Sequence, residues 1–168
     1  TRDKKSIAGL VEYMAHDVGS FPKNAYRMTF TDNHDMNSWN GTQFSNFGDG
    51  LESAMVFCTV VNGMPLVYSG QEAGLNRSLK FFDKDEIEWK KHPFADLYTK
   101  LFALKHKNQA LWNGNHGGEM VRIFSDQMNQ VISFSRTKGK DQVIPIMNFS
   151  DKPVTVKLDT KYQKGNYT

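Results

Sequence analysis

The spacing of apolar residues in the first two thirds of the chain alternates between the helical and the extended period. Apolar positions recur at helical spacing over residues 7–14, 51–61 and 93–104. Residues 26–30 and 66–68 are short, mostly apolar runs that end in polar residues and predict strands. The resulting order of helix, strand, helix, strand, helix is typical of an α/β fold with parallel strands and right-handed crossovers.

The last third of the chain has a different pattern. Short runs of alternating apolar and polar residues are separated by turn signals, and they predict strands over 120–124, 131–135, 143–148 and 154–158. Strands at about ten-residue spacing favour an antiparallel sheet or a small β-sandwich. We therefore divide the chain into an α/β part, residues 1–112, and an antiparallel β domain, residues 113–168, joined by a glycine-rich turn.

Polar residues follow both predicted strands of the α/β part at their carboxyl ends. Asn33, His34 and Asp35 follow the first strand, and the polar run 69–72 follows the second. We expect an irregular loop over residues 36–47 and a helix N-cap at Asp49. A histidine–aspartate pair in a loop is by itself more often a cap or a turn than a site.

Composition excludes several classes of protein. The chain has 168 residues, a net charge of +3 and only short, scattered lysine pairs, so a nucleic-acid surface is not expected. Its longest apolar runs are too short to span a bilayer. The single cysteine, Cys58, excludes an internal disulfide and a cysteine-rich zinc site, and the five histidines lack metal-ligand spacing. We predict no metal or other cofactor in this chain.

Several segments resemble the α-amylase family of glycoside hydrolases. Phe30-Thr31-Asp32-Asn33-His34-Asp35 resembles the family's F-x-x-N-H-D motif after the seventh barrel strand. Residues 63–72, GMPLVYSGQE, are similar to its segment around the eighth strand, and 81–89, FFDKDEIEW, to the segment that follows. The resemblance implies the C-terminal part of a TIM (β/α)8 barrel followed by the small antiparallel β domain. Residues 37–42, NSWNGT, resemble more narrowly the outer-membrane starch-degrading amylases of gut Bacteroidetes.

The resemblance assigns roles to individual residues. It implies that Asp35 is the third catalytic carboxylate, which holds sugar hydroxyls and stabilises the oxocarbenium-like transition state. His34 is implied as a contact to the same sugar. Asn33 is a second candidate contact, but shaping the turn is the favoured role for it. Trp39 is a candidate for stacking on a sugar ring, against a packed loop aromatic. Arg77 is a candidate substrate contact, against an exposed loop arginine.

The two other catalytic groups of the family have no counterpart here. Retaining hydrolysis needs a nucleophile and an acid/base about 5 Å apart, and both precede the seventh-strand motif in the family. A barrel needs about 250 residues, and two strands cannot close one. We expect an excised or proteolytic piece of a longer enzyme that acts on α-1,4-glucans such as starch and maltooligosaccharides, inactive alone. Hydrolysis and transglycosylation both remain open.

Three further expectations follow from this resemblance. The longer protein is expected outside the cytoplasm: periplasmic, at the cell surface or secreted. Calcium occurs in the family, with ligands mostly upstream of this chain. The alternative to an enzyme piece is a stand-alone carbohydrate-binding or structural module that self-associates through its incomplete barrel.

Overall fold

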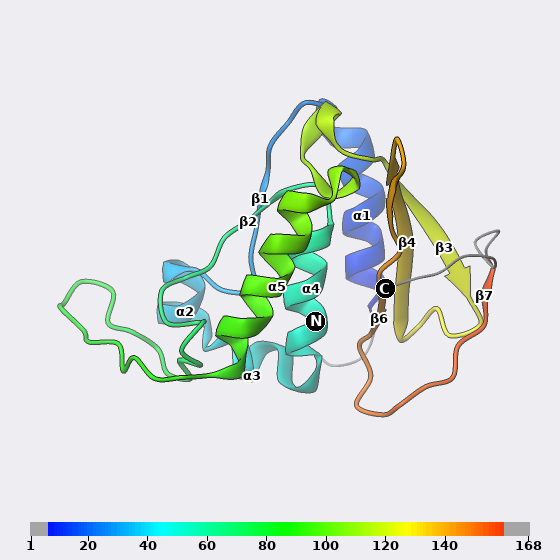
Figure 1. The fold of residues 1–168 in the computed structure, drawn as a ribbon. Coiled ribbons are helices and arrows are strands. Elements are labelled where there is room, and N and C mark those ends of the chain that lie inside the picture. The colour runs from blue at the N-terminus through cyan, green and yellow to red at the C-terminus, as the bar shows by residue number, and fades with distance from the viewer. Residues whose placement is uncertain (1–6, 160–168) are drawn as a thin grey trace.

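The computed structural model describes residues 7–159, and Figure 1 shows helices on one side and an antiparallel sheet on the other. The helices are α1 (Ala8–Ser20), α2 (His34–Asn40), α3 (Gln43–Phe47), α4 (Leu51–Val60) and α5 (Pro93–Lys107). Three 3-10 turns, η1 (Gly48–Gly50), η2 (Gln109–Leu111) and η3 (Gly114–His116), join them to their neighbours. The predicted helices near residues 7, 51 and 93 are confirmed.

Two very short strands, β1 (Met28–Thr29) and β2 (Met64–Pro65), pair in parallel with α4 between them. This is the predicted crossover unit, but the second strand lies before residues 66–68 and not on them. Gly63 explains the shift, because a Cβ there would lie 2.9 Å from the Arg27 carbonyl oxygen. Only glycine lets the backbone approach β1 so closely, and the pairing therefore begins directly after it.

The segment predicted as an irregular loop, residues 36–47, folds instead into α2 and α3. The side chain of Asn33 caps α2 by accepting a 2.7 Å hydrogen bond from the Met36 amide. Thr42 caps α3 in the same way, with 3.2 Å to the Ser45 amide. The prediction of Asp49 as an N-cap is wrong: Asp49 lies within η1, and Gly50 precedes α4 without a side-chain cap. Short helices with good caps need little apolar periodicity.

The last third of the described chain forms one five-stranded sheet, and its antiparallel pairing confirms the prediction. Its strands are β3 (Met120–Ser125), β4 (Val131–Lys138), β5 (Asp141–Val143), β6 (Ile146–Asn148) and β7 (Leu158–Asp159). The predicted single strand 143–148 is split into β5 and β6 around Pro145, which has no amide to donate to β4. Residues 154–157, predicted as strand, belong to no strand, and residues 160–168 lie outside the description.

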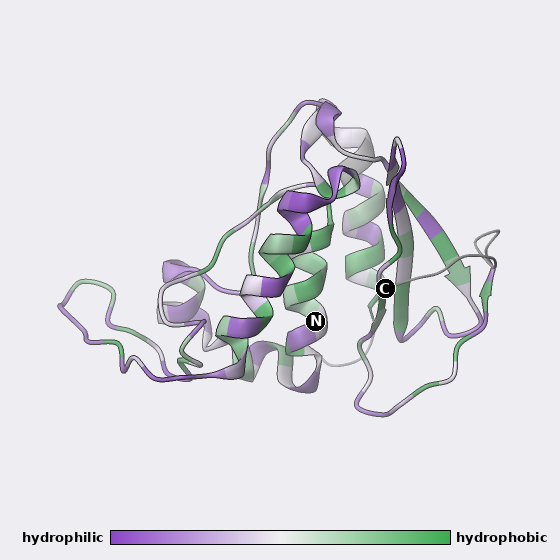
Figure 2. Cartoon of the chain, in the orientation of Figure 1, coloured by the Kyte–Doolittle hydropathy of each residue, from purple (hydrophilic) through white to green (hydrophobic). Residues whose placement is uncertain are grey.

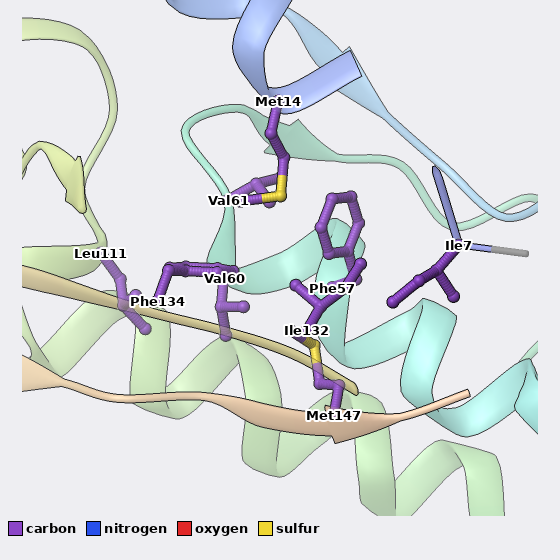
Figure 3. Packing of buried hydrophobic residues seen from close by; sticks show 9 residues of the cluster. All are labelled: Ile7, Met14, Phe57, Val60, Val61, Leu111, Ile132, Phe134 and Met147. Carbon is purple, nitrogen blue, oxygen red and sulfur yellow. The ribbon is translucent and has the colours of Figure 1, made fainter. Parts of the chain in front are cut away.

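The sheet packs against helices, and this contact is the main core of the described chain. Figure 3 shows the cluster between α1, α4, β4 and β6; it comprises Ile7, Met14, Phe57, Val60, Val61, Leu111, Ile132, Phe134 and Met147. Figure 2 shows that α4 is largely apolar. This agrees with the apolar residues that recur throughout 51–61 and indicate a buried helix. The partner of the sheet in residues 7–159 is thus a helical layer, and one core joins both parts of the chain.

A buried arginine and a half-buried lysine close the end of α4. Arg136 on β4 is fully buried, and its guanidinium donates hydrogen bonds to the carbonyls of Val60 (2.9 Å) and Val61 (3.0 Å). Lys105 on α5 donates to the Thr59 carbonyl (3.0 Å) and the Leu111 carbonyl (2.9 Å). Carbonyls at a helix C-terminus lack partners within the helix and carry partial negative charge, so both cations stabilise this terminus.

Candidate functional site

Asp35 and His34 lie at the carboxyl end of β1, in the first turn of α2. The His34 Nε2 is 3.6 Å from the Asp35 Oδ2, and both side chains are more than half exposed. A carboxylate and an imidazole side by side on an open surface can accept and donate hydrogen bonds to sugar hydroxyls. The structure therefore places the two predicted residues together, on a face without enclosing walls.

Asn33 and Trp39 lie near this pair. The Asn33 side chain is engaged in a hydrogen bond, whereas the Trp39 side chain is exposed. The Asn33 side-chain oxygen is occupied by the helix cap, so the side chain shapes the turn that presents His34. Trp39 is 64% exposed, and its ring centroid lies 5.5 Å from that of Phe81. The Phe81 ring also lies 5.7 Å from the His34 ring. Trp39 is thus exposed beside the pair and in contact with a second aromatic side chain.

Arg77 is engaged within its own loop. Its Nη1 and Nη2 donate to the two Asp85 carboxylate oxygens, each at 2.8 Å. These bonds, and then one from the Lys80 amide, hold the pKa of Asp85 well below its ordinary value. The two-pronged pair ties together the two ends of the segment 77–85, which leaves less of the guanidinium for a ligand.

A buried polar pair underlies α2 and fastens it to this loop. Asp32 is 2% exposed and accepts hydrogen bonds from the Asn33 amide (3.0 Å) and the Asn37 side-chain amide (3.2 Å). Burial raises the pKa of the Asp32 carboxyl, and these hydrogen bonds oppose the rise. The Asn37 side chain also accepts from the Leu79 amide at 2.7 Å and donates to the Arg77 carbonyl at 3.2 Å. Asp32 and Asn37 thus position the surface that carries His34 and Trp39.

A second buried network joins the two strand ends. The Gln71 Nε2 donates to the Gln43 Oε1 at 2.6 Å and to the Thr31 hydroxyl at 2.8 Å. The Gln71 Oε1 accepts from the Tyr68 amide, and Glu72 accepts from the Gly70 amide at 2.9 Å. Gln71 and Glu72 therefore serve the backbone of the turn after β2, as hydrogen-bond partners in the structure.

Sequence reasoning missed the part played by Asn37 and Phe82. Asn37 is 1% exposed although it lies in a run of polar residues, and Phe82 is 86% exposed although it is fully apolar. Both invert the usual relation between hydropathy and burial. An apolar pair in an otherwise polar, irregular segment was the only available signal for Phe81 and Phe82.

One face of the two-stranded sheet of β1 and β2 packs against α4, and the opposite face is exposed. Thr29 points toward α4, where its hydroxyl donates to the Cys58 carbonyl at 2.7 Å. The registered pair Met28 and Met64 lies on the opposite face and is 54% and 43% exposed. Parallel sheets are ordinarily covered on both faces, and helices lie outside a closed barrel. The exposed methionines therefore lie where further strands would be expected to close a barrel around them.

Comparison with known sequences identifies related proteins. Residues 122–168 match the family described as "Alpha amylase, C-terminal all-beta domain". The chain is 26% identical over 163 residues to "Alpha-amylase MalA" of Haloarcula japonica, covering 93% of this chain and 22% of that protein. It is 28% identical over 151 residues to a cyclomaltodextrin glucanotransferase of a Bacillus species, covering 84% of this chain and 20% of that protein. The chain thus spans about a fifth of the length of these two relatives.

Solved structures share the fold. A noncanonic maltogenic alpha-amylase, AmyB from Thermotoga neapolitana, matches 96% of this chain and 37% of its own, with a TM-score of 0.79 and 24% identity. An alpha-amylase from Lactobacillus plantarum matches 84% of this chain and 32% of its own, with a TM-score of 0.66 and 18% identity. The expected fold, the end of a barrel followed by an antiparallel β domain, is therefore confirmed. The narrower likeness to outer-membrane amylases of Bacteroidetes stays a prediction.

Two further findings concern residues 7–159. None of the helices described there is both long and apolar enough to cross a membrane. The same residues bring no three histidine, cysteine, aspartate or glutamate side chains together in a way that would hold a metal ion.

Proposed function

We propose that this chain is the C-terminal part of a retaining glycoside hydrolase of the α-amylase family that acts on α-1,4-linked glucans. Asp35 is the transition-state-stabilising carboxylate of that enzyme, and His34 contacts the same sugar. The observation that carries this proposal is the exposed Asp35–His34 pair at the carboxyl end of β1, the face on which barrel enzymes carry out chemistry. The names of the relatives, which include alpha-amylases and a cyclomaltodextrin glucanotransferase, support the substrate class.

The chain alone is inactive under this proposal. A nucleophile and an acid/base must flank the scissile bond, and we place both in preceding strands of the longer protein. The Asp35 and His34 side chains are both more than half exposed, which supports a site that preceding strands complete. We place the longer protein outside the cytoplasm, where polymeric glucans are met.

The test compares the chain with the longer protein in a reducing-sugar assay on soluble starch. We expect no release by the chain, and release by the longer protein that Asp35→Asn lowers at least about 100-fold in kcat, the size of effect that loss of one transition-state contact produces. Asp96→Asn is the matched control, because Asp96 is also an exposed acid in the first turn of a helix. Hydrolysis by the chain, or full activity of Asp35→Asn, would contradict the proposal.

A second candidate function has one observation in its favour. The bare face at Met28 and Met64 must be covered for the barrel part to be stable, and a second copy of the chain is an alternative cover to preceding strands. A self-associating carbohydrate-binding module would elute as a dimer in gel filtration at micromolar concentration. A chain that elutes as a monomer would dismiss this candidate.

A further inference from the structure

The side-chain amine of Lys105 lies where two helices end. Figure 1 shows α4 and α5 side by side, and Lys105 is in the last turn of α5. Its Nζ donates to the Thr59 carbonyl in the last turn of α4 and to the Leu111 carbonyl in η2. Both acceptors are neutral backbone oxygens. Within residues 7–159 no carboxylate forms an ion pair with this amine.

A second cation lies beside this amine. The Arg136 Nη1 donates to the same Leu111 carbonyl at 3.3 Å, and the Arg136 side chain is fully buried. Removal from water and a nearby like charge both disfavour the ammonium form, and together they lower the pKa of Lys105 to about 8. A lysine that is desolvated, or that lies next to another cation, is the kind that acts as a nucleophile in proteins. Lys105 meets both conditions.

The hydrogen bonds of Lys105 suit the neutral amine as well as the ammonium. An ammonium has three N–H donors, whereas a neutral amine has two N–H donors and one lone pair. Two carbonyls are bonded to Nζ, so the loss of one proton costs neither bond. The lone pair of the tetrahedral nitrogen then points away from both carbonyls. Lys105 can therefore keep its place at the end of α4 while its nitrogen is nucleophilic.

Lys105 lines a cavity at the opposite end of β1 from Asp35, because Tyr26 in its wall precedes that strand and Asp35 follows it. The cavity has a volume of about 530 Å³. Its lining includes five rings, those of Tyr26, Phe102, His106, Trp112 and His116. None of the described residues that line it is acidic. Flat aromatic walls favour a flat, apolar occupant over a charged one.

We propose that Lys105 is a nucleophilic amine that forms a Schiff base with a small aromatic aldehyde bound in this cavity. The Nζ lone pair attacks the carbonyl carbon, and one Nζ proton moves to the carbonyl oxygen, which gives a carbinolamine. An imidazolium of His106 or His116 then protonates the hydroxyl, which leaves as water while the C–N double bond forms. The remaining Nζ proton passes to the imidazole that results, so nothing is oxidised or reduced. This site is separate from the proposed hydrolytic site.

The test follows reductive trapping of benzaldehyde on the chain at pH 7.5. Cyanoborohydride reduces a Schiff base to a stable secondary amine, and peptide mass spectrometry gives the labelling rate of each lysine. A pKa of about 8 leaves roughly a quarter of the Lys105 amine neutral, against about a thousandth for an ordinary lysine. We expect Lys105 to react at least about tenfold faster than Lys100, which is exposed on the same helix. Unfolding in guanidinium chloride should abolish this difference.

The dependence of the labelling rate on pH separates reactivity from access. The rate at Lys105 should level off above about pH 9, whereas the rate at Lys100 should still rise steeply there. Equal rates at Lys105 and Lys100 in the folded chain, or parallel pH profiles, would overturn the proposal.

A variant of the cavity wall tests where the aldehyde binds. Tyr26→Ala should lower the rate at Lys105 with benzaldehyde roughly three- to tenfold, the size of one aromatic contact, and should leave the rate with acetaldehyde unchanged. Phe82→Ala is the control, because Phe82 is 86% exposed and lies outside the cavity. Circular dichroism would verify that both variants fold. A benzaldehyde rate that Tyr26→Ala leaves unchanged would overturn the cavity as the binding site.

Discussion

The Arg136 guanidinium donates a 2.9 Å hydrogen bond from its Nη1 to the carbonyl oxygen of Val60, which lies 76 positions earlier in the chain. Further bonds reach the carbonyls of Gly118 at 3.0 Å and Trp112 at 2.6 Å. Within residues 7–159 no carboxylate is bonded to this guanidinium. Backbone carbonyls from both parts of the chain therefore satisfy a fully buried cation, and Arg136 joins those parts directly.

Replacing Arg136 should strongly destabilise the chain. Arg136→Met keeps the aliphatic bulk but leaves several buried carbonyls without donors, and we expect a loss of about 3 kcal/mol in the free energy of unfolding. Urea denaturation followed by circular dichroism would measure it.

Arg122→Met is the matched control for that variant. Arg122 is two strand positions from Met120, which pairs with Arg136, and lies on the same face of the sheet. Within residues 7–159 its buried Nε and Nη1 have no hydrogen-bond partner, and burial lowers the pKa of Arg122. Removing this charge should be neutral or stabilising. Equal losses from both variants would show that the hydrogen bonds from Arg136 to the backbone carbonyls are not the cause.

Lys105 gives the chain a dependence of stability on alkaline pH. Burial, and next the nearby charge of Arg136, lower the pKa of Lys105 from 10.5 to about 8. Between these two values the unfolded chain binds more protons at this residue than the folded chain, so the free energy of unfolding should rise with pH across that window. Below about pH 8 both states are protonated, and no slope is expected from Lys105.

Lys105→Met should flatten that rise. The measurement is urea denaturation at intervals from pH 7.5 to pH 10.5, for the wild type and the variant. Lys100→Met, on the exposed side of the same helix, should keep the wild-type slope. A slope that is the same in all three proteins would show that other groups govern the alkaline behaviour.

Asn37 should control the order of the loop that carries Phe81. Asn37→Ala removes the acceptor for the Leu79 amide and the donor to the Asp32 carboxylate, and we expect a loss of about 1–3 kcal/mol for these buried groups. Hydrogen exchange at the Leu79 amide should become faster. Asn40→Ala, on the same helix, should leave that exchange unchanged, because the Asn40 side chain donates to the Met36 sulfur of its own helix, at 3.8 Å.

Gly118 should tolerate no side chain. A Cβ at this position would lie 2.5 Å from both the amide nitrogen and the carbonyl oxygen of Thr137, which are backbone atoms that cannot move aside. Gly118→Ala should therefore lower the thermal midpoint by several degrees, as overpacked sites do. Gly19→Ala should raise it slightly, because Gly19 lies within α1 with no atom near its Cβ position. Similar midpoints for the two variants would contradict this reading.

The features that could be predicted from the sequence are those encoded locally. The apolar run of α4 and the stripe of α5 indicate their helices directly, and the polar triplet Asn33, His34 and Asp35 marks the carboxyl end of a strand. The helices α2 and α3 were missed because their caps, Asn33 and Thr42, occur in a polar segment that resembles a loop. Arg136 could not be foreseen as buried, because its partners lie 18 to 76 positions away and are backbone atoms that every residue carries.

The same limit applies to the candidate site. Its central pair lies within one motif, whereas the contact between Trp39 and Phe81 depends on how a distant loop is fastened to α2. Asn37 and Leu79 lie 42 positions apart, and nothing in either local sequence indicates that they meet. Phe81 and Phe82 look like core residues by hydropathy, but they are 39% and 86% exposed.

The oxidation rates of the exposed Met28 and Met64 on β1 and β2 should show whether another polypeptide covers this face of the sheet. A thioether that water reaches is oxidised by dilute peroxide to the sulfoxide, whereas a packed one is protected. Met28 and Met64 should therefore gain oxygen quickly in the chain as described, and Met55, which is 1% exposed, slowly. Any polypeptide that completes the barrel would slow the first two and leave the third unchanged. Mass spectrometry of three peptides would then follow assembly without a label.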